Sequence, residues 1–148
     1  MSAPLSGSHV DMTGGDRAPL SVLMVASEAL PFVKTGGLAD VAGALTTALG
    51  RLGHEVTLVV PLYREIGWVG APYARCHLSL GGHWYDVGFV ERSLGARARV
   101  VLIECDELYD REGVYGIGGR DHPDNAVRFA LLARAALELV LRARRPPD

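Results

Sequence analysis

The residues best suited to chemistry lie in one short stretch, PFVKTGGLAD, which spans residues 31–40. It holds Lys34, the only lysine among 15 basic residues, shortly before the pair Gly36 and Gly37. Lysine and arginine are not interchangeable where a compact charge must reach a phosphate oxygen. Glycines let the backbone approach an anion without a Cβ in the way. The stretch therefore predicts a site for a phosphorylated ligand; the alternative is a tight turn with a solvated lysine.

The elements around this stretch are those that build such a site. The apolar runs 20–26 and 55–61 are typical of strands buried on both faces. Between them, apolar residues recur at helical spacing and form one stripe of an amphipathic helix: Leu38, Val41, Ala42, Leu45, Leu49 and Leu52. Gly53 is placed to end the helix. The short connections predict a parallel pair of strands with a right-handed crossover. The glycine turn then opens a helix whose first N–H groups attract anions.

The rest of the chain predicts a hairpin, a strand and a helix. Residues 73–80 and 83–92 flank a glycine pair and indicate a β-hairpin. Residues 99–104 indicate another buried strand, 106–123 a long irregular segment, and 124–144 a helix. The fold class is therefore α/β, a Rossmann-like parallel sheet with a β-hairpin insertion.

The boundaries of the domain follow from the ends of this pattern. Residues 1–18 are rich in Gly, Ser and Pro, without periodicity, and are expected to form a disordered leader. No strand follows the last helix, although a helix of an α/β fold normally leads to one. We therefore expect residues 19–148 to be the front part of a larger domain, truncated before its next strand.

Composition excludes several classes of function. The net charge of −2 and the lack of a basic cluster with aromatics argue against nucleic acid. No apolar run reaches the roughly 18 residues that span a membrane. Cys76 and Cys105 form no C-x-x-C pair and are expected to be reduced thiols of a cytoplasmic protein. His77 and His83 flank the hairpin turn, but exposed polar residues explain them better than a metal site.

Two other nucleotide-binding motifs do not fit. The chain has no P-loop, because its only lysine precedes its glycines. Gly116 and Gly118 begin like a dinucleotide fingerprint, but Asp121 occupies the last glycine position. The turn around Lys34 thus remains the candidate site for a phosphorylated ligand.

A resemblance to a known family extends this prediction. PFVKTGGLADVAGAL closely resembles the N-terminal signature of bacterial glycogen synthases and plant starch synthases, which are ADP-glucose-dependent glucan glucosyltransferases. Three further segments resemble the family in the same order: LGHEVTLVVPLY, ELYDREGVYG and HPDNAVRFALLARAALEL. The resemblance covers about residues 20–148. Thr46 departs from it, since many members carry proline there, and this touches packing and not the site.

The resemblance implies roles for six residues. Five would bind the ADP-glucose donor: Lys34, Gly36, Gly37, Asp40 and Tyr115. Glu28 would face the cleft that holds the acceptor glucan, with a solvated loop acid as the alternative. Asp40 could instead be only an acid in the first helical turn, which is favourable in itself. Tyr115 could be only an aromatic anchor for its long loop.

Four neighbouring polar residues have structural explanations. Asp110 and Arg111 are expected to hold the long loop and not to touch ligand. Asn125 and Arg128 begin the last helix and could be capping residues only.

For the whole enzyme, the resemblance implies a glycosyltransferase-B fold, of which this chain is an incomplete N-terminal domain. Glucose would pass from ADP-glucose to the non-reducing end of an α-1,4-glucan such as glycogen or starch. The anomeric configuration would be retained, and no metal or other cofactor would be needed. No catalytic residue can be assigned within this span, so the missing C-terminal part of the enzyme would be an essential partner. The alternative is a catalytically inactive remnant or a sugar-nucleotide-binding module.

Overall fold

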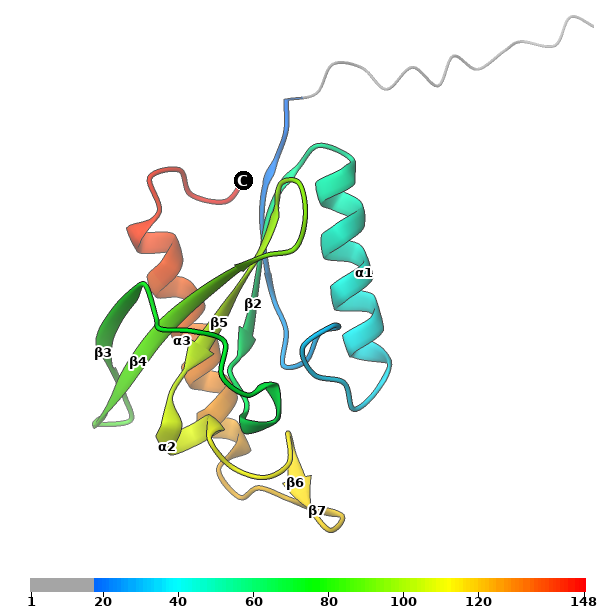
Figure 1. Cartoon of the computed structure of the whole chain (residues 1–148). Helices are drawn as coiled ribbons and strands as arrows, with labels where there is room; N and C mark the ends of the chain where they lie inside the picture. Colours follow the sequence, from blue (N-terminus) through cyan, green and yellow to red (C-terminus); the bar gives the residue numbers. More distant parts are fainter. Residues whose placement is uncertain (1–17) are drawn as a thin grey trace, which may run out of the picture.

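The computed structural model describes residues 18–148, which fold around a five-stranded sheet (Figure 1). The predicted leader lies outside the described residues except for its last position. The strand order is β1-β2-β5-β4-β3, so β1 and β3 form the two edges. The strands are β1 (Ser21–Val25), β2 (Glu55–Pro61), β3 (Ala74–Leu80), β4 (His83–Ser93) and β5 (Ala98–Glu104).

The sheet combines a parallel part with an antiparallel hairpin, as the sequence predicts. β1 pairs with β2 and β2 with β5 in parallel register. β4 pairs antiparallel with both β5 and β3. Gly81 and Gly82 make the turn between β3 and β4 with φ angles of 61° and 83°, which glycine adopts without strain. The α/β class with a hairpin insertion is therefore confirmed.

The helix α1 (Gly37–Arg51) turns a different face to the sheet from the one its leucines predicted. Its buried residues are small: Ala39, Ala42, Gly43, Thr46 and Gly50. Most of the predicted stripe faces outward: Leu38 is 48% exposed, Val41 61%, Leu45 44% and Leu52 75%. The cause is close approach, because a Cβ added to Gly43 would lie 2.5 Å from the carbonyl oxygen of Leu30. Large side chains have no room on that face, so of the predicted stripe only Ala42 is buried and Leu49 is partly buried.

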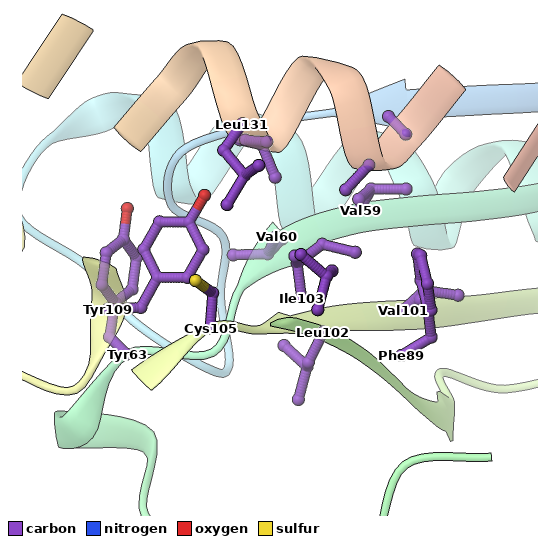
Figure 2. Close-up of a cluster of buried hydrophobic side chains, with 14 of the residues drawn as sticks. Val59, Val60, Tyr63, Phe89, Val101, Leu102, Ile103, Cys105, Tyr109 and Leu131 are labelled. Carbon is purple, nitrogen blue, oxygen red and sulfur yellow. The ribbon is translucent and has the colours of Figure 1, made fainter. Parts of the chain in front are cut away.

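The core lies between the sheet and two long helices, α1 and α3 (Asn125–Arg142), which Figure 1 shows on opposite sides of the sheet. Residues 58–60 of β2 and 100–103 of β5 are at most 1% exposed. Figure 2 shows side chains of both strands beneath Leu131 of α3, with Tyr63 and Tyr109 at one end of the cluster. Burial on both faces explains why these two strands are continuous apolar runs.

The strand β1 is less buried than its apolar sequence predicted. Residues 21–24 are only partly buried, and Val25 is 45% exposed. The reason is position, since β1 is an edge strand in the described part of the chain.

The segment predicted as irregular contains three short elements. These are α2 (Asp106–Tyr109), β6 (Gly116–Ile117) and β7 (Arg120–Asp121). Gly118 and Gly119, with φ angles of 58° and 78°, form the turn that lets β6 pair with β7. A 3-10 turn, η1 (Arg64–Ile66), also follows β2. Among residues 18–148, no helix is long and apolar enough to span a membrane.

Candidate functional site

The candidate site lies where β1 ends and the turn into α1 begins. Leu30 donates its backbone N–H to the carbonyl oxygen of Ala39 at 3.0 Å, and Val33 donates to Ala29 at 3.1 Å. These bonds fold residues 26–36 back onto the first turn of the helix. The turn therefore stands at the carboxyl end of a parallel strand, where open α/β sheets bind ligands.

Glu28 is buried in this turn, with only 3% of its surface exposed. Its Oε2 atom accepts hydrogen bonds from the Thr35 N–H at 2.5 Å, the Thr35 hydroxyl at 2.6 Å and the Gly36 N–H at 3.3 Å. Glu28 is therefore not a solvated loop acid. It fixes the backbone that leads into α1, a contact that could not be predicted from residue types and spacing.

Gly36 and Gly37 differ in what they leave free. The N–H of Gly36 donates to Glu28, whereas those of Gly37, Leu38 and Ala39 have no partner among residues 18–148. A Cβ added to Gly37 would meet no atom within 4 Å. The helix therefore begins with three available donors and open space, a combination suited to an anion.

Lys34 and Asp40 meet across this turn. The Lys34 Nζ atom lies 2.8 Å from Oδ1 and 2.7 Å from Oδ2 of Asp40, and both side chains are about half exposed at 47% and 50%. An exposed pair of this kind contributes at most about 1 kcal/mol to stability. Its main effect is to hold the lysine charge against the first turn of α1.

Tyr115 reaches the same place from a distant part of the chain. Its hydroxyl lies 2.7 Å from the Ser27 hydroxyl, next to Glu28. Its carbonyl oxygen accepts bonds from the side chain of Asn125 and the backbone N–H of His122, both at 2.8 Å. Tyr115 thus anchors its loop, and this anchoring also brings its ring to the end of β1.

Tyr63 provides a second connection to Ser27. Its hydroxyl donates to the Ser27 carbonyl oxygen at 2.8 Å, and its ring packs edge-on against Tyr109 at 5.8 Å (Figure 2). Burial raises the pKa of the Tyr63 hydroxyl above its ordinary range, so it remains a neutral donor. The end of β1 is therefore held from two sides.

Arg128 has a role in this region that the sequence did not reveal, because it is a buried anchor and not a capping residue. It is fully buried, and its guanidinium donates to the carbonyl oxygens of Leu108 at 2.9 Å and Val114 at 2.7 Å, and to the side chain of Asn125 at 2.7 Å. It also lies within 6 Å of three aromatic ring centres. The sequence feature that indicates its burial is helical spacing, which places Arg128 on the same face of α3 as the buried residues Leu131, Leu132, Ala135 and Ala136.

The capping role considered for Asn125 and Arg128 was therefore wrong. Asp124 is the N-cap residue of α3 and makes no side-chain capping bond. The Asn125 side chain instead connects Tyr115 to Arg128. Both residues stabilise the loop between β5 and α3.

Asp110 and Arg111 hold this loop, as expected. Asp110 accepts a bond from Arg64 at 2.8 Å, and Arg111 donates to Asp124 at 2.9 Å.

The hairpin histidine His83 pairs with an acid, since its ring lies 3.1 Å from Glu107. Among residues 18–148, no group of three or more His, Cys, Asp or Glu side chains could hold a metal ion. Cys76 and Cys105 are unpaired.

An apolar cavity of about 220 Å³ lies elsewhere, at the opposite end of the parallel strands. Its walls include Val22, Tyr73, Phe89 and Leu139. None of the six predicted site residues lines it. The predicted residues instead gather at the carboxyl end of β1, with Tyr115 joined to them through Ser27.

An open α/β sheet that ends in a glycine turn, a lysine and free helix N–H groups is typical of domains that bind phosphorylated ligands. The comparisons with known proteins identify which such domain this is. The chain belongs to the starch synthase catalytic domain family, whose model matches residues 21–148. This family consists of glycosyltransferases, and the expected fold, part of a glycosyltransferase-B catalytic domain, is confirmed.

Individual relatives agree with the family assignment. The chain is 47% identical over 122 residues to glycogen synthase from Anaeromyxobacter dehalogenans, covering 81% of this chain and 25% of that protein. It is 37% identical over 133 residues to glycogen synthase 2 from Geobacter metallireducens, covering 87% and 27%. It also resembles the solved catalytic domain of starch synthase IV from Arabidopsis thaliana, bound to ADP and acarbose, with a TM-score of 0.76 and 29% identity over 88% of this chain. The chain spans about a quarter of the length of these relatives.

Proposed function

We propose that this chain forms the N-terminal, donor-site part of an enzyme that transfers glucose from ADP-glucose to the non-reducing end of an α-1,4-glucan, with retention of configuration. The observation that carries the proposal is the start of α1. Three N–H groups without a partner in the described part of the chain lie there, and Asp40 holds the Lys34 ammonium against the first turn. A diphosphate at this position would accept bonds from the helix and neutralise the lysine charge.

Each predicted site residue has its own role in this proposal. Lys34 and the Gly37 N–H would contact the phosphates, and Gly36 would give the backbone its close approach. Asp40 would release Lys34 to the ligand while remaining near the donor. Tyr115 would line the nucleotide side of the pocket. For Glu28, Oε2 holds the turn, and Oε1, which has no partner among residues 18–148, would face the acceptor cleft.

The solved relative supports the choice of ligands. Starch synthase IV was determined with ADP and acarbose bound, and its fold matches 88% of this chain. We propose ADP-glucose and an α-1,4-glucan as the substrates of the enzyme to which this chain contributes. We also propose a cytoplasmic location, which is supported by the two unpaired cysteines Cys76 and Cys105.

A further part of the proposal concerns the sheet, which would continue beyond β1. The Asp148 N–H donates to the Ser21 carbonyl oxygen at 2.9 Å, as the first residue of a neighbouring strand would. A following strand at this edge would cover the partly exposed β1.

The alternative to the proposed enzyme function is an inactive remnant or a sugar-nucleotide-binding module. Sequencing the DNA after codon 148 distinguishes them: a continuing open frame supports the enzyme, and a stop codon supports the alternative.

Calorimetry with ADP tests the donor site. We expect weak binding, which Lys34→Ala reduces by at least about tenfold because one charge-assisted contact to phosphate is lost. Arg51→Ala is the control, since Arg51 is a cation in the last turn of the same helix. Equal affinity of Lys34→Ala and the unaltered chain would remove Lys34 from the site.

We expect the 148-residue chain alone to transfer no glucose to glycogen, and ADP release that depends on both substrates would contradict this.

A further inference from the structure

The loop that follows β2 presents a tryptophan to solvent. Trp68 is 90% exposed, although its neighbours Ile66 and Val69 pack against the core. Two glycines with positive φ, Gly67 at 73° and Gly70 at 99°, flank it and give the loop a shape that other residues rarely adopt. A large aromatic side chain held outward in this way is typical of a surface that binds a ligand or another molecule.

Trp68 stands over a concave site and not on a flat surface. A pocket of about 350 Å³ lies between this loop and the start of α2, a size suited to a small ligand. Figure 1 shows the loop after β2 beside α2, near the ends of β2 and β5. Besides Trp68, the polar and aromatic residues of the lining are Tyr63, Arg64, Glu104, Asp106 and Asp110.

The loop is held in place by specific contacts. The Ile66 N–H donates to the Tyr63 carbonyl oxygen at 3.0 Å, and Arg64 donates to Asp110 at 2.8 Å. A Cβ on Gly70 would lie 2.4 Å from the Arg92 guanidinium, so the loop packs closely there. The tryptophan therefore sits on a defined wall of the pocket.

The charges of the pocket select its ligand. Three carboxylates and one arginine line it, so nucleotides and other anions are disfavoured. The carboxylates of Asp110 and Glu104 pair with Arg64 and Arg75. The Asp106 side chain has no hydrogen-bond partner among residues 18–148, so its carboxylate is free to accept bonds from hydroxyl groups. A sugar offers hydroxyl donors around its edge and polarised C–H groups on its face, which the electron-rich face of an indole attracts.

We propose that Trp68 and this pocket bind a segment of the α-1,4-glucan, with the indole stacked on a glucose ring and Asp106 accepting hydroxyl bonds. This rests on the proposed function, which supplies the glucan. The pocket also shares a residue with the donor region, because Tyr63 lines it and donates to the Ser27 carbonyl oxygen. A glucan held here would stay close to the end of β1.

The two tryptophans of the chain allow a direct test, since Trp84 lies on the hairpin and does not line the pocket. In the Trp84→Phe variant, Trp68 is the only indole, and titration with maltoheptaose should shift its emission saturably. In the unaltered chain, Trp68→Ala should weaken retention in gels that contain glycogen by about tenfold or more. Trp84→Ala should leave retention unchanged, and Asp106→Asn should reduce it. Circular dichroism checks that each variant is folded.

ADP calorimetry on the same proteins separates the two proposals. Absence of an emission shift while ADP still binds would overturn the glucan pocket and leave the donor site standing. A saturable shift without ADP binding would support the pocket and contradict the donor site. A shift caused by an arginine-rich peptide but not by maltoheptaose would overturn the proposal in favour of a protein-binding surface.

Discussion

At the scale of single residues, Arg128 holds the loop that carries Tyr115. Its guanidinium satisfies the carbonyl oxygens of Leu108 and Val114 and supports Asn125, which in turn binds Tyr115. Burial lowers the pKa of Arg128 from its ordinary value, and its Nη2 atom has no partner among residues 18–148. A buried guanidinium is costly, which indicates that the hydrogen bonds Arg128 donates to Leu108 and Val114 are needed to hold the loop.

Arg128→Met should therefore destabilise the fold. The substitution leaves two buried carbonyl oxygens without donors, and we expect a loss of about 2–4 kcal/mol. Urea unfolding measures this loss. Arg134→Met, six residues further along α3, is the control and should change stability by less than about 1 kcal/mol, because Arg134 makes only a partly exposed ion pair. An unchanged midpoint for Arg128→Met would contradict the role of Arg128 as an anchor.

The sequence identified residues whose type alone carries meaning. Lys34 and Gly37 were predicted because a lysine and a glycine have known effects at a phosphate site beside a helix start, whereas the donor role of Asp40 was implied by the family resemblance. Ser27 and Arg128 could not be found in this way, because their importance comes from partners that are distant in the chain. Glu28 was located correctly at the end of β1, but which atoms it contacts depended on the path of the turn.

At the scale of elements, the packing of α1 decides how the site is presented. The helix approaches the turn and the sheet closely through its small residues, which fixes its N-terminus at the end of β1. Sequence periodicity identified the helix and its end near Gly53, which has a φ of 96°. It chose the wrong face because a stripe of leucines outweighs a stripe of glycine and alanine on any hydrophobicity scale. Space, and not hydrophobicity, settled the orientation.

Gly43→Ala tests this account of α1. In an exposed helix, alanine in place of glycine stabilises by about 0.5–1 kcal/mol. Here the added Cβ would lie 2.5 Å from the Leu30 carbonyl oxygen, so we expect a loss of about 1–3 kcal/mol. Gly37→Ala, in the same helix but with open space, should not destabilise. Thermal unfolding compares the two variants, and a stabilised Gly43→Ala protein would show that the contact with Leu30 is not close.

At the scale of the whole molecule, the pH dependence of stability reflects buried groups. Burial raises the pKa of the Cys105 thiol from 9.0 to about 11, and burial also raises the pKa values of Tyr63 and Tyr109. Above about pH 9, the unfolded chain therefore releases protons that the folded chain keeps. Stability falls with pH wherever the unfolded state binds fewer protons.

We therefore expect the free energy of unfolding not to change through these groups below pH 9 and to fall as the pH rises from 9 toward 11. Urea unfolding at a series of pH values measures this. Constant stability up to pH 11 would show that Cys105, Tyr63 and Tyr109 are not kept neutral by burial.

The central claim is that the start of α1 binds the diphosphate of the donor. The most direct measurement is an NMR titration of the isotope-labelled chain with ADP, which follows each backbone amide separately. We predict that the amide signals of Gly37, Leu38 and Ala39 move most, together with that of Lys34, since these groups lie at the free end of the helix. Signals that do not move, or that move instead around the apolar cavity at Tyr73 and Leu139, would contradict the claim.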